Sequence, residues 1–243
     1  MSNGASPGGG QETALYDLFR AIVMHDRPLV SRLLADSPAL VRLAVTVGAT
    51  REAAEAYFFS EISHYAYAGD TALHIAAAAY ELPIAEELMS AGANISARNR
   101  RGAQPIHYAV DGSPESARWN PDGQYAVVAF LIAAGADPNA QDKSGVAPLH
   151  RAVRTRCTGA VRALLDHGAD AIRRNKSGST PLHLAVQNTG RGGTGAAASQ
   201  GEQAKVIRLL LDHGARPSDK DTSGKSVLAC VKAEWIEALL RGA

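Results

Sequence analysis

The chain has 243 residues, of which 46% are hydrophobic and 20% charged, so it can form a folded core and does not belong to the disordered class. Its formal net charge of +1 argues against a nucleic acid as partner, because nucleic-acid-binding proteins usually carry a strong basic excess. No apolar run approaches the roughly 20 residues that span a bilayer, so we expect no membrane partner. The only two cysteines, Cys157 and Cys230, have no CxxC spacing, which favours a reducing, cytoplasmic location.

Residues 1–10 are rich in glycine and lack the basic start and apolar stretch of a secretory signal, so we expect a flexible tail. Residues 11–68 are expected to form a helical cap followed by a degenerate repeat. Two helical stripes carry this prediction, Leu15, Leu18, Phe19 and Ile22, then Val30, Leu33 and Leu34 after Pro28. Ser37-Pro38 and Thr50 are candidate starts for two further helices, 38–45 and 50–59.

A repeated unit begins after residue 68. Segments of the form G-x-x-x-L-H-x-A, or close variants of it, start at Gly69, Gly102, Gly145 and Gly178, and a degenerate copy starts at Gly224. Their spacings are 33, 43, 33 and 46 residues. A second motif recurs in phase with the first, as AGAN at 91, AGAD at 134, HGAD at 167 and HGAR at 213. Two motifs that recur together at a fixed offset indicate a repeat protein.

These motifs resemble those of the ankyrin repeat, in which T-P-L-H-x-A is followed by G-A-D within 33 residues. The resemblance covers roughly Gly69 to Ala243 and implies a hairpin finger, an inner helix, a turn and an outer helix in each unit. We therefore predict an all-α solenoid of stacked helix-turn-helix units with hairpin finger loops and atypical terminal caps. The predicted units are 69–101, 102–144 with an insertion, 145–177, 178–223 with an insertion, and a C-terminal cap at 224–243.

Local chemistry supports this arrangement. Thr180 can cap a helix through its hydroxyl group, and Pro181 suits the first helical position because its φ is already set. Pro105 and Pro148 occupy the equivalent positions. Glycines are predicted with positive φ at the ends of the outer helices, at 92, 135, 168 and 214, and in the finger turns, at 102, 145, 178 and 224.

Both insertions fall between an inner and an outer helix, at Asp111–Tyr125 and Asn188–Gln203. They would leave the same edge of the stack two units apart, so an alternative function is an enzyme or small-molecule binder with a pocket between them. The glycine-rich 188–195 segment lacks the Lys-Ser/Thr ending of a P-loop. Its backbone amides could still hold an anion, which makes Arg191, Gly192 and Gly193 candidate small-ligand residues.

The sequence gives no catalytic set, metal site or cofactor motif. His74, His107, His150 and His183 recur once per unit, about 10 Å apart, which is too far to share one metal ion with bonds near 2 Å. The resemblance implies instead that each histidine bonds neighbouring backbone and stiffens the finger loops.

The resemblance also implies that finger tips and the exposed face of the inner helices contact a protein partner. Cations at these tips predict a partner with an acidic surface, although exposed turns also favour charge for solubility. The candidate partner-binding residues, on a chain expected to be a monomer, are Tyr65, Tyr67, Arg100, Arg101, Trp119, Lys143, Arg154, Lys176, Gln187 and Lys225. Trp119 is either an anchor of its insertion or a contact residue. Phe58 and Phe59 are expected to pack against the first repeat.

Overall fold

The structure is a computed structural model in which residues 10–112, 119–187 and 197–242 are described. The chain forms two compact units, Met1–Ala109 and Val110–Ala243, which meet in sequence just before the first insertion. Among the described residues, no helix has the length and the apolar character that crossing a bilayer requires.

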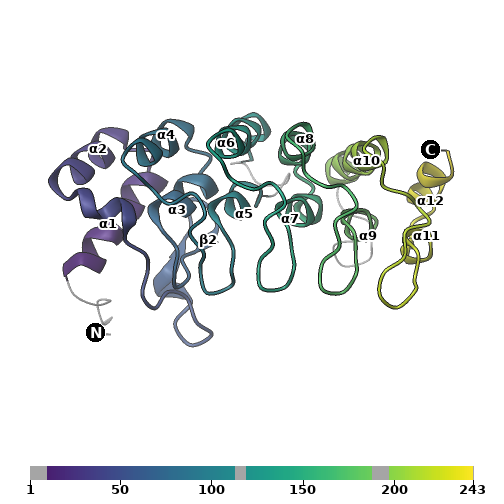
Figure 1. Ribbon diagram of the computed structural model, residues 1–243, viewed down its shortest axis with the longest axis horizontal. Coiled ribbons are helices and arrows are strands. Elements are labelled where there is room, and N and C mark those ends of the chain that lie inside the picture. The colour runs from purple at the N-terminus through teal and green to yellow at the C-terminus, as the bar shows by residue number, and fades with distance from the viewer. Residues whose placement is uncertain (1–9, 113–118, 188–196, 243) are drawn as a thin grey trace. The chain divides into compact units, whose positions relative to one another are not determined.

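The first unit is built from paired helices and one small hairpin. Helix α1 packs on α3 and α3 on α5, while α2 packs on α4, so inner and outer helices form two rows (Figure 1). Its elements are α1 (Gly10–Val23), α2 (Arg27–Asp36), the 3-10 helices η1 (Pro38–Arg42) and η2 (Glu55–Tyr57), β1 (Phe58–Phe59), β2 (His64–Tyr65), α3 (Ala72–Ala78), α4 (Leu82–Ser90) and α5 (Pro105–Ala109).

The two predicted helices of the N-terminal cap are present. Leu15, Leu18, Phe19 and Ile22 form the buried face of α1. In α2, the Asp26 side chain caps the first turn by accepting a hydrogen bond from the Leu29 N–H at 3.0 Å. The apolar faces of the two helices then close this end of the first unit's core.

The predicted helices at 38–45 and 50–59 are wrong. The first is only the short 3-10 helix η1, and the second gives way to η2 and the antiparallel hairpin β1–β2, in which Phe58 lies opposite Tyr65. Tyr57 and Phe59 are buried while Phe58 between them is exposed, which is the period-two alternation of a strand. Tertiary packing of these aromatic side chains outweighs the helix propensity of the preceding Glu and Ala residues.

The second unit repeats the helix pair more regularly. Outer helices α6, α8 and α10 form one row, and inner helices α7, α9 and α11 form another, with finger loops extending beyond the inner row (Figure 1). Its elements are α6 (Pro121–Ala133), α7 (Pro148–Thr155), α8 (Thr158–Asp166), α9 (Pro181–Ala185), α10 (Ala197–Asp212), α11 (Val227–Cys230) and α12 (Glu234–Arg241). Stacked helix pairs of the expected ankyrin type therefore make up the fold.

Parts of both predicted insertions are helical. Helix α6 has 13 residues and α10 has 16, whereas α8, whose unit lacks an insertion, has 9. The inserted residues thus lengthen the outer helices at their N-terminal ends. Gly159 at the start of α8 makes room for this extension, because a Cβ atom there would lie 2.3 Å from the Pro121 carbonyl oxygen.

The glycines predicted at the outer-helix ends and in the finger turns all have positive φ. Pro105, Pro148 and Pro181 begin α5, α7 and α9, as predicted. Thr180 and His183 form a capping box at the start of α9, in which Nδ1 of His183 accepts from the Thr180 N–H at 3.2 Å. The Thr180 hydroxyl group lies 2.8 Å from the same nitrogen.

Candidate protein-binding surfaces

Each finger turn is closed by one Asn or Asp side chain. The Oδ1 atom of Asn175 accepts hydrogen bonds from the N–H groups of Ser177 at 2.9 Å and Ser179 at 3.1 Å. Asn99, Asp142 and Asp221 make the same pair of bonds in their own fingers. The hydroxyl group of Ser223 also donates to Asp221 and lowers the pKa of that carboxyl group below its ordinary value. The acidic groups of the fingers are therefore turned toward their own backbone.

Neighbouring fingers within a unit are joined by a periodic backbone bond. In the second unit the N–H of Lys176 donates to the Ser144 carbonyl at 3.3 Å, and the N–H of Thr222 donates to the Ser177 carbonyl at 3.4 Å. In the first unit the N–H of Arg100 donates to the Ala68 carbonyl at 2.7 Å. This ladder fixes the spacing of the finger tips, so the side chains on them form an ordered row within each unit.

His74, His150 and His183 have the structural role that the sequence predicted for the four repeated histidines. In His150, Nδ1 accepts from the Ala147 N–H at 3.2 Å, which leaves Nε2 protonated to donate to the Ser179 carbonyl of the next finger at 3.1 Å. His74 and His183 make the same two bonds, to the carbonyl groups of Ala103 and Lys225. Burial lowers the pKa of His150 and so favours the neutral ring.

Some basic residues beside the finger tips also have structural roles. The guanidinium group of Arg174 donates to the Gly178 carbonyl of its own finger at 2.9 Å and to the Lys220 carbonyl of the next. Gln141 occupies the same repeat position and bonds Gly145 and Arg174 in the same way, each at 3.0 Å. This position therefore bridges fingers, which makes its charge a poor candidate for partner contact.

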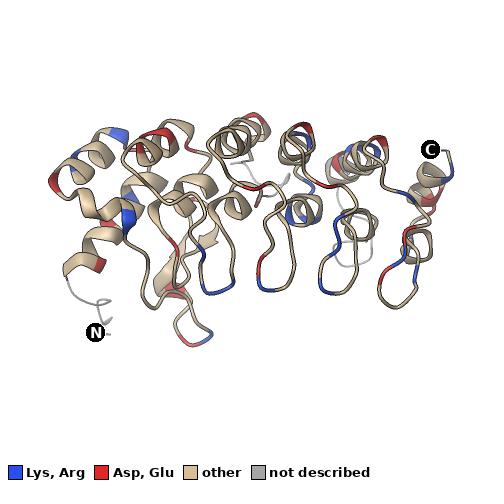
Figure 2. Cartoon of the chain, viewed as in Figure 1, with Lys and Arg blue, Asp and Glu red and all other residues tan. Residues whose placement is uncertain are grey.

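The predicted finger-tip cations of the second unit are, in contrast, exposed. Lys143, Lys176 and Lys225 lie on three fingers, and none makes an ion pair with any described residue. Arg154 and Gln187, from the inner-helix layer, are exposed as well. Basic residues are visible along the finger loops of this unit (Figure 2). On α7, by comparison, Arg151 is neutralised by Asp111 at 3.1 Å and Asp142 at 3.5 Å.

In the first unit, Tyr67 brings the predicted basic and aromatic residues together. The guanidinium carbon of Arg101 lies 4.2 Å from the centroid of the Tyr67 ring, and that of Arg100 lies 5.2 Å away. Both distances are within the range of a cation–π interaction. Arg100 also donates to the Ala49 carbonyl, so its guanidinium group is held in place, while the side chain of Arg101 has no further partner among the described residues.

A buried carboxylate that no sequence motif marks, that of Asp70, positions this cluster. Asp70 is fully buried and accepts hydrogen bonds from the Tyr67 N–H at 2.6 Å and from the Tyr108 hydroxyl at 2.7 Å. Its other oxygen accepts from the Asn99 amide at 3.0 Å. The only sequence signal is an acidic residue at a repeat position where the next three units carry Ala103, Val146 and Ser179.

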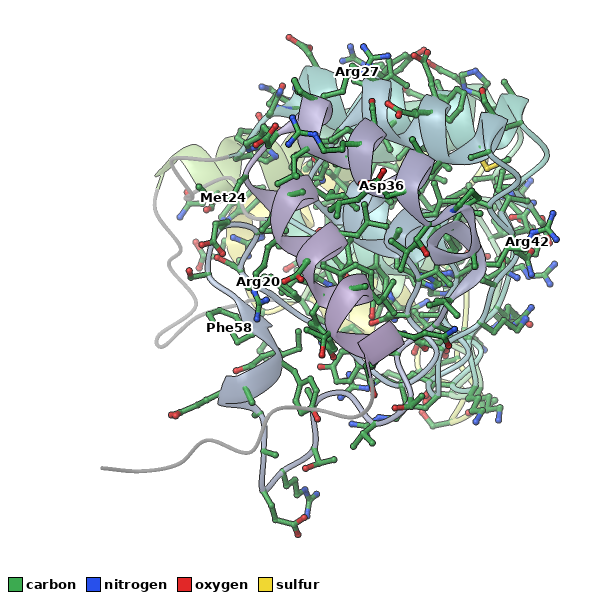
Figure 3. All side chains as sticks on the ribbon, turned by 90° about the vertical axis from the view of Figure 1, so that its left-hand side faces the viewer. Arg20, Met24, Arg27, Asp36, Arg42 and Phe58 are labelled. Carbon is green, nitrogen blue, oxygen red and sulfur yellow. The ribbon has the colours of Figure 1, made fainter. Side chains whose placement is uncertain are left out.

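The hairpin adds two exposed aromatic side chains beside Tyr67. Phe58 is 42% exposed and Tyr65 is 37% exposed, and their ring centroids are 4.7 Å apart. The expectation that both phenylalanines pack against the first repeat is wrong for Phe58, because alternate strand residues face opposite sides and Phe58 faces solvent. Phe59 is buried, and its ring centroid lies 6.1 Å from that of Phe19 in α1. Phe58 lies at the edge of the first unit, outside α1 (Figure 3).

Trp119 occupies the end of the first insertion. Its ring is partly buried, and its Nε1–H donates to Oε1 of the buried Gln124 at 3.3 Å. Gln124 in turn donates to the Asp111 carbonyl at 3.1 Å, which ties the start of α6 to the end of the preceding segment. Of the two roles that the sequence allows, this geometry favours the anchor. Cys157, buried beside these side chains, has a thiol pKa raised by burial.

The candidate small-ligand residues Arg191, Gly192 and Gly193 lie outside the described residues, and so does most of the insertion that carries them. At its end, buried Gln203 donates to the Ala185 carbonyl at 2.7 Å, the same device that Gln124 provides. Within residues 10–112, 119–187 and 197–242, no cluster of His, Cys, Asp or Glu side chains could hold a metal ion.

Two family models match the chain. Residues 120–221 match a model described as ankyrin repeats (3 copies), and residues 68–100 match that of a single ankyrin repeat. Together they cover more than half of the sequence. The hairpin and the N-terminal helices lie outside both matches. A search of curated proteins found no match.

Proposed function

Because the chain belongs to the ankyrin-repeat family, we propose that it is a protein-interaction module whose exposed finger cations receive an acidic surface on a partner protein. Ankyrin repeats are generally protein–protein interaction modules, and their partners are generally proteins. The cations proposed to make the contact are Arg101 in the first unit and Lys143, Lys176 and Lys225 in the second. Arg154 and Gln187 would extend the contact onto the inner helices.

One observation carries this proposal, namely the asymmetry between acidic and basic groups on the fingers. Asp142 and Asp221 direct their carboxylates into their own turns, whereas Lys143 and Lys176 are exposed and have no carboxylate partner among the described residues. Charges that served solubility alone would need no such separation. A row of unpaired positive charges attracts a negatively charged surface on another protein. It raises the association rate of the two proteins and fixes the register in which they bind.

The test compares three charge reversals on the finger tips with two on the outer helices. Arg101→Glu, Lys143→Glu and Lys176→Glu change the finger tips, while Arg162→Glu and Arg208→Glu change exposed cations on outer helices α8 and α10. Each tagged variant is used to capture proteins from a lysate of the source cells, and bound proteins are quantified by mass spectrometry. We expect proteins retained by the unmodified chain to be lost with the finger variant and kept with the outer-helix variant.

Two further measurements, the salt dependence of capture and the melting temperature, complete this experiment. Capture should weaken as ionic strength rises, because the contact is between exposed charges that salt screens within about 10 Å at 0.1 M. Melting temperatures of all variants should agree, since every substituted side chain is exposed. Equal capture by the finger variant and the unmodified chain would refute the assignment of the finger tips as the docking surface.

A further inference from the structure

The hairpin of the first unit carries a surface that the repeat motif does not explain. Its strands β1 and β2 precede residue 68, where the first family match begins. Phe59 holds the hairpin to the core through Phe19 and Tyr16, with ring centroids 6.1 Å and 6.4 Å away. The opposite face of the hairpin therefore has a fixed position, and its aromatic side chains are presented to solvent.

Three aromatic rings on that face form a row that ends at two arginines. Phe58 and Tyr65 are directly opposed across the hairpin, with centroids 4.7 Å apart. Tyr65 and Tyr67 are two residues apart on one extended segment, with centroids 6.4 Å apart. Arg100 and Arg101 then lie over the ring of Tyr67. We call these five residues the aromatic–arginine surface.

The backbone leaves room for this stacking. Gly48 pairs with Tyr67 in an antiparallel bridge and has a φ of +62°. A Cβ atom at Gly48 would lie 2.7 Å from the Cα atom of Tyr67 and 2.4 Å from the amide nitrogen of Ala68. Only glycine allows this close approach, which holds Tyr67 in place beneath the finger that carries Arg100 and Arg101.

The charges on this surface are not neutralised within the described part of the chain. Neither Arg100 nor Arg101 makes an ion pair with a described carboxylate. The nearby carboxylate of Asp70 is fully buried, and hydrogen bonds from Tyr67, Asn99 and Tyr108 occupy it. The surface thus combines exposed apolar rings with two unpaired positive charges.

We infer that the aromatic–arginine surface binds an acidic peptide segment that places an apolar side chain on Phe58 and Tyr65 and its carboxylates on Arg100 and Arg101. This inference rests on the proposed protein-binding function and adds the chemistry of one partner segment. Tyrosine and arginine, together with tryptophan, are enriched among the few residues that dominate the binding energy of protein interfaces. A single-stranded nucleic acid would also stack on the rings, but it needs a basic groove along its backbone, and two arginines do not supply one.

The experiment selects ligands without assuming their sequence. The full chain is immobilised and panned with a random twelve-residue peptide library displayed on phage, and enriched peptides are synthesised with a fluorescent label. We expect enriched sequences to carry Asp or Glu within a few residues of Phe, Leu or Trp. Fluorescence anisotropy then measures their affinity for variants of the chain.

Affinity should fall about tenfold or more with Arg101→Glu, and by a similar factor with Phe58→Ser plus Tyr65→Ser, as expected for central interface residues. Ile172→Ser is the matched control, since Ile172 is an apolar residue 52% exposed in the second unit. Arg162→Glu is the matched control for charge, since Arg162 is an exposed cation on the outer helix α8. Both controls should keep the affinity within about twofold.

The peptides supply a second set of variants that cannot affect folding of the chain. Replacing their acidic residues by Asn or Gln, or their apolar residue by Ser, should weaken binding as strongly as the protein variants do. Selection of no peptides, selection without acidic residues, or tighter binding of a labelled fifteen-residue oligothymidylate would overturn the inference. If those results occurred while the finger variant still lost its captured partner, the proposed function would stand and only this inference would fail.

Discussion

The buried carboxylate of Asp70 accepts a hydrogen bond from the side-chain amide of Asn99, with 3.0 Å between Oδ1 and Nδ2. Asn99 closes the finger that carries Arg100 and Arg101, and the other oxygen of Asp70 holds the Tyr67 N–H. One carboxylate thus joins the two halves of the aromatic–arginine surface. This surface therefore depends on a side chain that does not itself reach solvent.

Asp70→Ala should destabilise the first unit by about 3 kcal/mol or more, because it leaves buried donors on Tyr67, Asn99 and Tyr108 without their acceptor. The measurement is the urea midpoint of unfolding. Asp17→Ala is the control, since Asp17 is exposed and its one ion pair with a described residue is with Arg20 on the same helix, and it should change stability by less than about 0.5 kcal/mol. Equal midpoints for the two variants would show that the hydrogen bonds of Asp70 contribute nothing to the stability of the folded chain.

The repeating part of the fold could be predicted because each of its signals has a local cause. Pro181 sets the first turn of α9, Gly178 turns its finger, and His183 links two fingers through bonds that recur in other units. The conformation of residues 50–59 could not be predicted, because it depends on packing against residues far away in the sequence. Phe59 lies in a strand and packs against Phe19 in α1, forty residues away in sequence. Helix propensity depends on local sequence and does not report such a contact.

The candidate site was predictable in its residue types but not in its organisation. The resemblance placed Arg101 and Lys176 on finger tips, where the structure exposes them. It could not separate Lys176 from Arg174, two residues earlier, whose charge bridges backbone carbonyl groups of neighbouring fingers. It also gave no indication that Arg100 and Arg101 share one tyrosine ring, because the relevant distances arise from the non-repeat hairpin.

Acid should destabilise the second unit through His150. Burial lowers the pKa of this ring from 6.5, so as the pH falls below 6.5 the unfolded chain takes up a proton before the folded chain does. The stability that neutral His150 contributes is therefore complete above pH 6.5 and is lost as the pH falls toward the folded-state pKa. Over that window the free energy of unfolding should fall by up to about 1.4 kcal/mol per pH unit for this group.

His150→Gln tests this assignment, because it removes the titrating group and keeps a polar side chain in its place. Urea unfolding is measured from pH 8 to pH 5 for both proteins. The variant should be less stable than the unmodified chain at pH 8, and the difference between them should shrink as the pH falls. Parallel profiles would assign the acid sensitivity to other groups.

Finger packing can be measured with two glycines of equal backbone conformation. Gly178 has a φ of +74° and Gly224 a φ of +79°, so alanine at either position incurs a similar strain of about 1 kcal/mol. At Gly178 the new Cβ would also lie 2.5 Å from the amide nitrogen of Thr222, whereas at Gly224 it meets no described atom within 4 Å. Gly178→Ala should therefore cost about 1–2 kcal/mol more than Gly224→Ala, since it also displaces the neighbouring finger.

A second pair of glycines tests how the first insertion docks on the repeat. Gly159 lies in α8 against the Pro121 carbonyl oxygen, which a Cβ atom would approach to 2.3 Å, whereas no atom of a described residue lies within 4 Å of the Cβ position at Gly201 in α10. Alanine favours a helix over glycine by up to about 1 kcal/mol, so Gly201→Ala should stabilise the chain. In Gly159→Ala the same gain is outweighed by forcing α6 and α8 apart, and we expect a net loss of about 1–2 kcal/mol. Opposite shifts of the melting temperature would establish that the lengthened α6 is packed tightly on α8, and a stabilised Gly159→Ala would show that the start of α6 moves away from α8 at little cost.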